Sequence, residues 1–140
     1  MKKLHISIAL LAVFVISATV NYVILFHWAG YTPPDKFQSL QLSILELHSL
    51  FVTMILGGLF AKTPLNMLIP QPLSIVSLVL CVLWAVFVTL AWVGYPYKIN
   101  VDTVIAQLDS HSKAASFLVA GVMTYLFGSS IKAEAAPGEA

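Results

Sequence analysis

The sequence is poor in charge and contains no arginine. Charged residues make up 9% of its 140 residues, hydrophobic residues make up 59%, and all 7 basic residues are lysines. Soluble domains carry about 25% charged residues and roughly 45–50% apolar ones. A soluble domain this small cannot hide so much apolar surface, so the composition predicts that a bilayer is the solvent. Without arginine the chain lacks the usual bidentate clamp for phosphate or carboxylate groups, and its net charge of +1 gives no case for nucleic-acid binding.

Cysteine is also scarce, and the usual catalytic motifs are missing. The single Cys81 excludes an intramolecular disulfide, a CxxC redox pair and a thiolate-rich metal site. Because it stands within the apolar run "LVLCVLW", we predict a small side chain packed between helices. No GxSxG motif, no nucleophile at a recognisable spacing from His and a carboxylate, and no glycine-rich phosphate loop occurs. The sequence therefore predicts a protein without enzymatic activity.

Long apolar runs are what the sequence has in abundance. Four of them are of the length that a membrane-crossing helix needs, about 20 residues; they cover residues 4–26, 40–61, 73–95 and 114–131. They predict an all-α integral membrane protein, with four transmembrane helices in an antiparallel up-down bundle that forms a single domain over residues 1–132. The small, polar residues 133–140 are expected to be a disordered cytoplasmic tail.

The start of the chain resembles a signal peptide, with a basic beginning and an apolar centre. The apolar run continues past any plausible cleavage position and contains no A-x-A triplet, so we expect a retained first span. Lys2 and Lys3 flank that span, which favours cytoplasmic termini in a multi-pass protein of a bacterial inner membrane. Aromatic residues that follow the first and third runs predict a belt at the outer interface: Trp28, Tyr31, Trp92, Tyr95 and Tyr97.

The connection between the third and fourth runs has a helical pattern of its own. Val101, Val104, Ile105 and Leu108 recur at helical spacing, and Asn100 can cap the start of that helix. We expect a short amphipathic helix along the outer membrane surface.

Polar residues inside the second apolar run form a stripe. At 3.6 residues per turn they share an arc of about 120°, and the stripe consists of Ser39, Ser43, Glu46, Ser49, Thr53 and Gly57. Small and hydroxylated residues are typical of a helix-packing seam, while a carboxyl group inside the membrane is also typical of proton or cation transfer. In the first run, Ser17 and Asn21 lie one turn apart, and Asn21 is the expected partner of Glu46 at equal depth.

His48 lies two residues after Glu46 and therefore points to the opposite side of the helix, together with Gln41. If Glu46 faces the bundle interior, His48 and Gln41 face outward. A histidine turned to bare lipid is unfavourable, so this geometry predicts that a partner subunit, a second copy or a bound cofactor covers that face.

Histidines give only a weak indication of a metal site. His27, His48 and His111 lie toward the predicted outer side, but their spacing fits no metal motif. A bis-histidine haem needs two facing histidines at similar depth, and only His48 falls within a span. We therefore assign no metal or cofactor to this chain alone.

These observations favour a non-catalytic accessory or scaffolding subunit of a membrane complex or homo-oligomer. One alternative is an oligomeric transporter or channel for protons, cations or small solutes that uses Glu46. Another is an electron-transfer subunit that shares a haem or quinone at His48. The expected partners are the lipid bilayer and another membrane subunit or a second copy, and nucleic acid is not among them.

Overall fold

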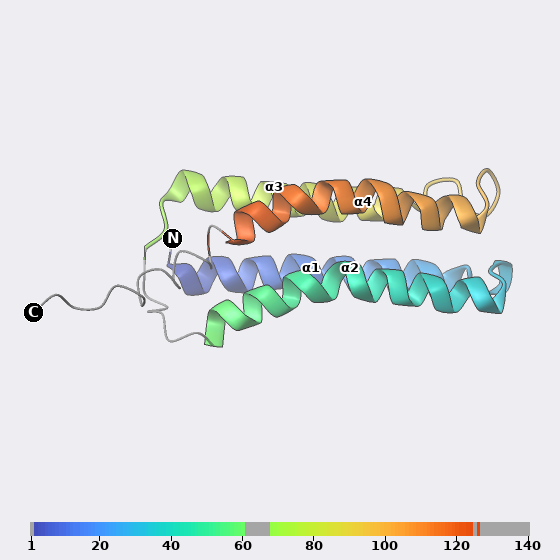
Figure 1. Ribbon diagram of the computed structural model, residues 1–140, viewed down its shortest axis with the longest axis horizontal. Helices are drawn as coiled ribbons and strands as arrows, with labels where there is room; N and C mark the ends of the chain where they lie inside the picture. Colours follow the sequence, from blue (N-terminus) through green and yellow to red (C-terminus); the bar gives the residue numbers. More distant parts are fainter. Residues whose placement is uncertain (1, 61–67, 125, 127–140) are drawn as a thin grey trace, which may run out of the picture.

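The chain folds into helices that lie side by side. The structure is a computed structural model that describes residues 2–60, 68–124 and 126. Its elements are α1 (Lys3–His27), a short 3-10 helix η1 (Ala29–Tyr31), α2 (Pro34–Phe60), α3 (Gln71–Leu90) and α4 (Val101–Met123). Figure 1 shows the long helices extending together along the longest axis of the molecule. The all-helical prediction is confirmed for the described residues.

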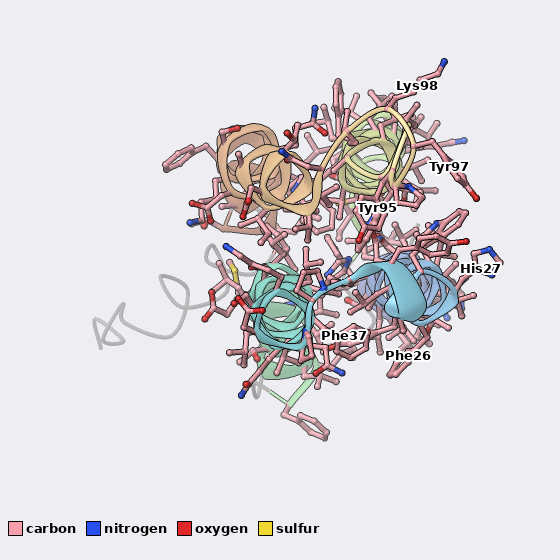
Figure 2. The ribbon with its side chains drawn as sticks, turned by 90° about the vertical axis from the view of Figure 1, so that its right-hand side faces the viewer. Phe26, His27, Phe37, Tyr95, Tyr97 and Lys98 are labelled. Carbon is pink, nitrogen blue, oxygen red and sulfur yellow. The ribbon has the colours of Figure 1, made fainter. Side chains whose placement is uncertain are left out.

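The helices occupy the corners of a square when viewed along their axes (Figure 2). The turns that follow α1 and α3 lie at the same end of the molecule, so α2 and α4 both start there. In this arrangement α1 packs against α2 and α3, and α4 packs against α3 and α2. The α1 and α4 helices therefore stand at diagonal corners.

Within the described parts of the chain, three helices are long and apolar enough to cross a membrane: α1, α2 and α3. α4 is not among them over its described length, where Asp102, Asp109 and Lys113 interrupt the apolar sequence. The predicted fourth span, residues 114–131, lies only partly within the described residues. The predicted tail, residues 133–140, lies wholly outside them.

Each of the first three helices buries one seam, in which successive buried residues are three or four positions apart except for the adjacent Ile6 and Ser7 of α1. The buried residues of α1 include Ser7, Leu10, Phe14, Ser17, Asn21 and Leu25, those of α2 are Leu40, Ile44, His48, Phe51, Ile55 and Gly58, and those of α3 are Ser74, Ser77, Cys81, Trp84 and Val88. Alternating steps of three and four are the spacing of knobs-into-holes helix packing. Cys81 is fully buried in this seam, as predicted.

Trp84 lies at the centre of the bundle. Its ring centroid is 5.3 Å from that of Phe14 in α1, 5.2 Å from that of Phe51 in α2 and 5.1 Å from that of His48. The rings of Phe14 and Phe51 stack at 4.9 Å. The indole Nε1–H donates to Ser116 Oγ of α4 at 3.0 Å, so one side chain of α3 contacts all three other helices.

The predicted boundaries differ from those of the structure at two turns. α2 starts at Pro34, before the predicted residue 40, because proline suits the first turn of a helix. α3 ends at Leu90, although the predicted span continues to residue 95. Turns follow it, and Gly94 adopts a φ of +94°, which a residue with a Cβ rarely adopts.

The predicted surface helix is not a separate element. Residues 101–109 form the first turns of α4, which continues without a break to Met123. Val104 and Leu108 are fully buried in the bundle, so packing against the neighbouring helices replaces the expected membrane-surface contact. The predicted cap is confirmed, because the Asn100 side chain accepts a hydrogen bond from the Thr103 N–H at 2.9 Å.

The aromatic residues predicted to form a belt gather at the end where both turns lie. The Trp28 ring is 5.7 Å from that of Tyr31 and 5.8 Å from that of Tyr97. The Tyr95 and Thr32 hydroxyls are hydrogen-bonded to each other at 2.6 Å, which joins the two turns. Figure 2 looks onto this end of the molecule.

Substitution of Gly94 tests the turn after α3. In Gly94→Ala the new Cβ meets Lys98 Cβ at 3.2 Å in a left-handed conformation, which should lower the free energy of unfolding by about 1–2 kcal/mol. The matched control is Gly57→Ala, where a Cβ meets nothing within 4 Å in a helix interior and should be neutral or stabilising by up to about 1 kcal/mol. Thermal unfolding of both variants in the same detergent measures the two stability changes. Equal destabilisation by the two substitutions would contradict the left-handed conformation of Gly94.

Candidate functional site

The orientation of α2 is the reverse of the predicted one. His48, expected to face outward, is buried together with Ile44 and Ile55, whereas Glu46, Ser49 and Thr53 of the polar stripe are exposed. The large apolar residues of α2 decide this orientation, because they fill the space between the helices better than serines do. The sequence signal for this buried face was the recurrence of aliphatic residues every three or four positions.

His48 is held entirely by this chain. It is 3% exposed, Nδ1 lies 2.7 Å from the carbonyl oxygen of Ile44, and Nε2 lies 3.0 Å from Ser17 Oγ. A carbonyl can only accept, so Nδ1 donates to it, and in the neutral imidazole Nε2 accepts from the Ser17 hydroxyl. Ser17 thus meets the need for a partner that was expected to come from another subunit.

Gln41, the other residue of the predicted partner-facing surface, is half-buried at the α1–α2 contact. Its backbone carbonyl accepts a hydrogen bond from the Tyr22 hydroxyl at 3.1 Å. The prediction that His48 and Gln41 face away from the bundle is therefore wrong.

Asn21 has partners other than Glu46. It is fully buried, and its Oδ1 accepts from Trp92 Nε1 at 2.8 Å. Its Nδ2 donates to the Ser17 carbonyl at 2.8 Å and lies 3.5 Å from Thr89 Oγ1. The predicted Asn21–Glu46 pair is wrong, because Glu46 lies on the exposed side of α2, away from α1.

These contacts form a polar network between α1, α2 and α3 in which the atoms named bond to each other or to backbone. The network explains the buried polar residues by structure alone, since an unpartnered polar group in the membrane core is costly. A haem iron at His48 would have to displace Ser17 from Nε2 or Ile44 from Nδ1.

The two candidate histidines whose side chains the structure describes lie apart. His27 is exposed beside Trp28 at the aromatic end, whereas His48 lies within α2 in the bundle core. The side chain of His111 lies outside those described. Among the described residues, no group of three or more His, Cys, Asp or Glu side chains is placed to hold a metal ion.

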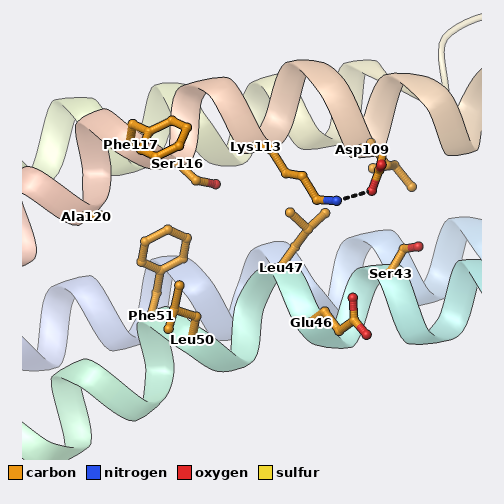
Figure 3. Close-up of a pocket in the computed structure, with 11 residues that line it drawn as sticks. Ser43, Glu46, Leu47, Leu50, Phe51, Asp109, Lys113, Ser116, Phe117 and Ala120 are labelled. Atoms are coloured by element: carbon orange, nitrogen blue, oxygen red, sulfur yellow. Dashed lines mark ion pairs between the residues drawn. The ribbon is translucent and has the colours of Figure 1, made fainter.

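A groove between α2 and α4 brings together charges that sequence reasoning left unconnected. Its volume is about 330 Å³, and its lining residues are Ser43, Glu46, Leu47, Leu50, Phe51, Leu108, Asp109, Lys113, Ser116, Phe117 and Ala120. Figure 3 shows Glu46 and Ser43 on α2 facing the same end of the groove as Asp109 and Lys113 on α4. Lys113 forms an ion pair with Asp109 one turn away.

Glu46 lies well along α2, away from the end of the bundle where α2 and α4 start. Lys36 of α2 and Asp102 of α4 form an ion pair at 2.7 Å, which sets the starts of these two helices level. At 1.5 Å per residue, Glu46 lies about 15 Å along the axis from that pair and Lys113 about 16 Å. The backbones of Glu46 and Lys113 are thus nearly level, while the Lys113 ammonium group reaches back to Asp109, about 10 Å from the Lys36–Asp102 pair.

A second groove, of about 360 Å³, lies between α1 and α3 and differs in chemistry. Apart from Ser17 and Thr89 its lining is apolar, with residues such as Val13, Val20 and Val86. None of its described lining residues is charged.

Sequence reasoning found Glu46 and Ser43 but missed Asp109, Lys113 and Ser116 as members of a site. The missing signal was the continuity of α4, because a separate surface helix over residues 101–109 would place these charges in water. The chain matches no protein-family model and shows no significant similarity to a curated protein or to a solved structure. The geometry therefore carries the functional inference by itself.

A double-mutant cycle tests the polar network. Asn21→Leu leaves Trp92 Nε1 without its acceptor, and with Trp92→Phe it should show a coupling energy of about 0.6–1.7 kcal/mol, the range for hydrogen bonds between membrane helices. The matched cycle of Asn21→Leu with Glu46→Gln should be additive, because the structure separates these residues. Unfolding free energies in one detergent measure both cycles, and coupling only in the second would contradict the network.

Proposed function

We propose that this chain is a four-span inner-membrane protein, with both termini cytoplasmic, that acts as a non-catalytic accessory or scaffolding subunit of a membrane complex or homo-oligomer. The four spans are those of an antiparallel up-down bundle, with α4 as the start of the fourth. Three apolar helices support the membrane assignment. The aromatic turns opposite the lysine-bearing amino terminus support the orientation.

The observation that carries the accessory role is the charge on α4. Asp109 and Lys113 are 62% and 61% exposed, and Phe117 beside them is 81% exposed. Charged side chains at such depth are unfavourable against lipid, and they normally face protein or a water-filled cavity. We infer that another membrane subunit or a second copy covers the exposed side of α4. This moves the proposed partner surface from the His48 side of α2 to α4.

Photo-crosslinking tests this partner surface. A benzophenone amino acid at Phe117 should capture a stoichiometric protein partner in native membranes. At Val15 the same group, on an exposed face of α1 (49% exposed), should capture lipid only. Purification in mild detergent without crosslinking should retain the same partner. A lone monomer, with no adduct at Phe117, would refute the accessory role.

A second candidate function is proton or cation transfer through Glu46, working as an oligomer. It is favoured by the position of Glu46 on the groove with Asp109 and Lys113.

Glu46→Gln separates the two functions, because it keeps the shape of the side chain and removes its charge. For the accessory subunit we expect unchanged abundance and partner capture. For the transporter we expect cation or proton flux in vesicles to fall at least tenfold, since a charge that carries the ion has no neutral substitute. Asp35→Asn, on the same helix outside the groove, is the control and should change neither quantity.

A further inference from the structure

We propose that the α2/α4 groove binds a lipophilic amine, a molecule with one ammonium head and a single apolar chain or body, which enters sideways from the bilayer. This inference goes beyond the accessory role; it rests on the membrane placement of α2 and α4 in the proposed function, and it does not need a partner subunit. The charges of the groove, its shape and its depth each select this class of ligand.

The charges of the groove favour a cation. Its described lining contains the carboxylates of Glu46 and Asp109 and the ammonium group of Lys113. Lys113 pairs with Asp109, whereas Glu46 makes no ion pair with a described residue. One negative charge is left over, and it attracts an ammonium group more strongly beside lipid than in water. An anionic head group would meet net repulsion.

The shape of the groove favours an amphiphile. Figure 3 shows the charged residues at one end of the groove, and Phe51, Phe117 and Ala120 toward the other end. An ammonium head at Glu46 therefore leaves an apolar body between these aromatic rings. The volume of about 330 Å³ is at the small end of the range for ligand pockets, roughly 300–1,000 Å³, which are mostly apolar with a few polar groups.

If the Lys36–Asp102 ion pair lies at the interface, as the proposed membrane placement has it, Glu46 lies too deep for the head group of a resident phospholipid. Glu46 lies about 15 Å along the helix axis from the Lys36–Asp102 ion pair, whereas phospholipid head groups stay at the interface. A single-chain amine carries one charge and no phosphate, so its head can move below the interface to reach a carboxylate.

Trp84 provides a reporter inside the bundle. Its ring is 5.2 Å from that of Phe51 and its Nε1 donates to Ser116, and both of these residues line the groove. The full-length protein in phosphatidylcholine nanodiscs would be titrated with chain-brominated dodecylammonium, dodecanol and dodecyl sulfate, because bromine quenches indole fluorescence at short range. Trp84→Phe identifies the part of the quenching that comes from this residue.

We expect saturable quenching of Trp84 by the ammonium probe at concentrations at which dodecanol and dodecyl sulfate quench little. Glu46→Gln should weaken the apparent affinity for the ammonium probe about tenfold or more, the usual effect of a lost charge-assisted contact. The same substitution should leave the apparent affinity for dodecanol unchanged. Asp35→Asn is the matched control and should bind like the wild type. Lys113→Gln should bind the ammonium probe more tightly, because it removes the competing cation.

Three results would each overturn the proposal: equal quenching by all three probes, an ammonium affinity that survives Glu46→Gln, or weaker ammonium binding in Lys113→Gln with helicity and monodispersity intact. Binding that appears only with added phosphatidylethanolamine would do the same and would assign the groove to a lipid head group. Disulfide pairing of two Glu46→Cys copies would assign it to a dimer contact. If the protein is a monomer and binds the amine, only the accessory role is refuted. If it forms a stable complex with a partner and does not bind the amine, only the proposal of an amine ligand is refuted.

Discussion

The packing of Trp84 is the interaction on which the bundle depends. Its ring contacts Phe14 and Phe51, and its N–H reaches Ser116, so it connects α3 to every other helix. In a bilayer, lipid is as apolar as the helix surfaces, so association depends on close packing and on hydrogen bonds rather than on hydrophobic burial. A large aromatic residue with one polar atom supplies both, and it needs small or flat neighbours on the facing helices.

The polar residues of α1 and α2 follow from the same constraint. Ser17, Asn21 and His48 occupy seam positions, where each finds a partner on the chain itself. Such hydrogen bonds fix the register of one helix against the next at little cost, because the alternative in lipid is an unsatisfied group. The three residues therefore have a structural explanation, although sequence patterns in membrane helices first suggest a functional one.

Structural hydrogen bonding does not explain the charged residues of the α2/α4 groove. Glu46, Asp109 and Lys113 lie outside the seam and are exposed. An ion pair between exposed side chains adds little stability, so their presence is not explained by the fold. A subunit that covers α4 and an amine that binds in the groove would each provide partners for these exposed charges. The two can occur together.

The sequence by itself determined the helical class, the membrane-compatible apolar runs, the Asn100 cap and the aromatic end, because these depend on composition and local spacing. It also contained the three-four seam, but it did not say whether the serine stripe or the Ile44–Ile55 side of α2 faces inward. That choice depends on which face fits Phe14 and Trp84, and only the tertiary structure decided it. The same holds for the groove: Glu46 and Lys113 are far apart in the sequence, and they share a depth only because α2 and α4 start level at one end of the bundle.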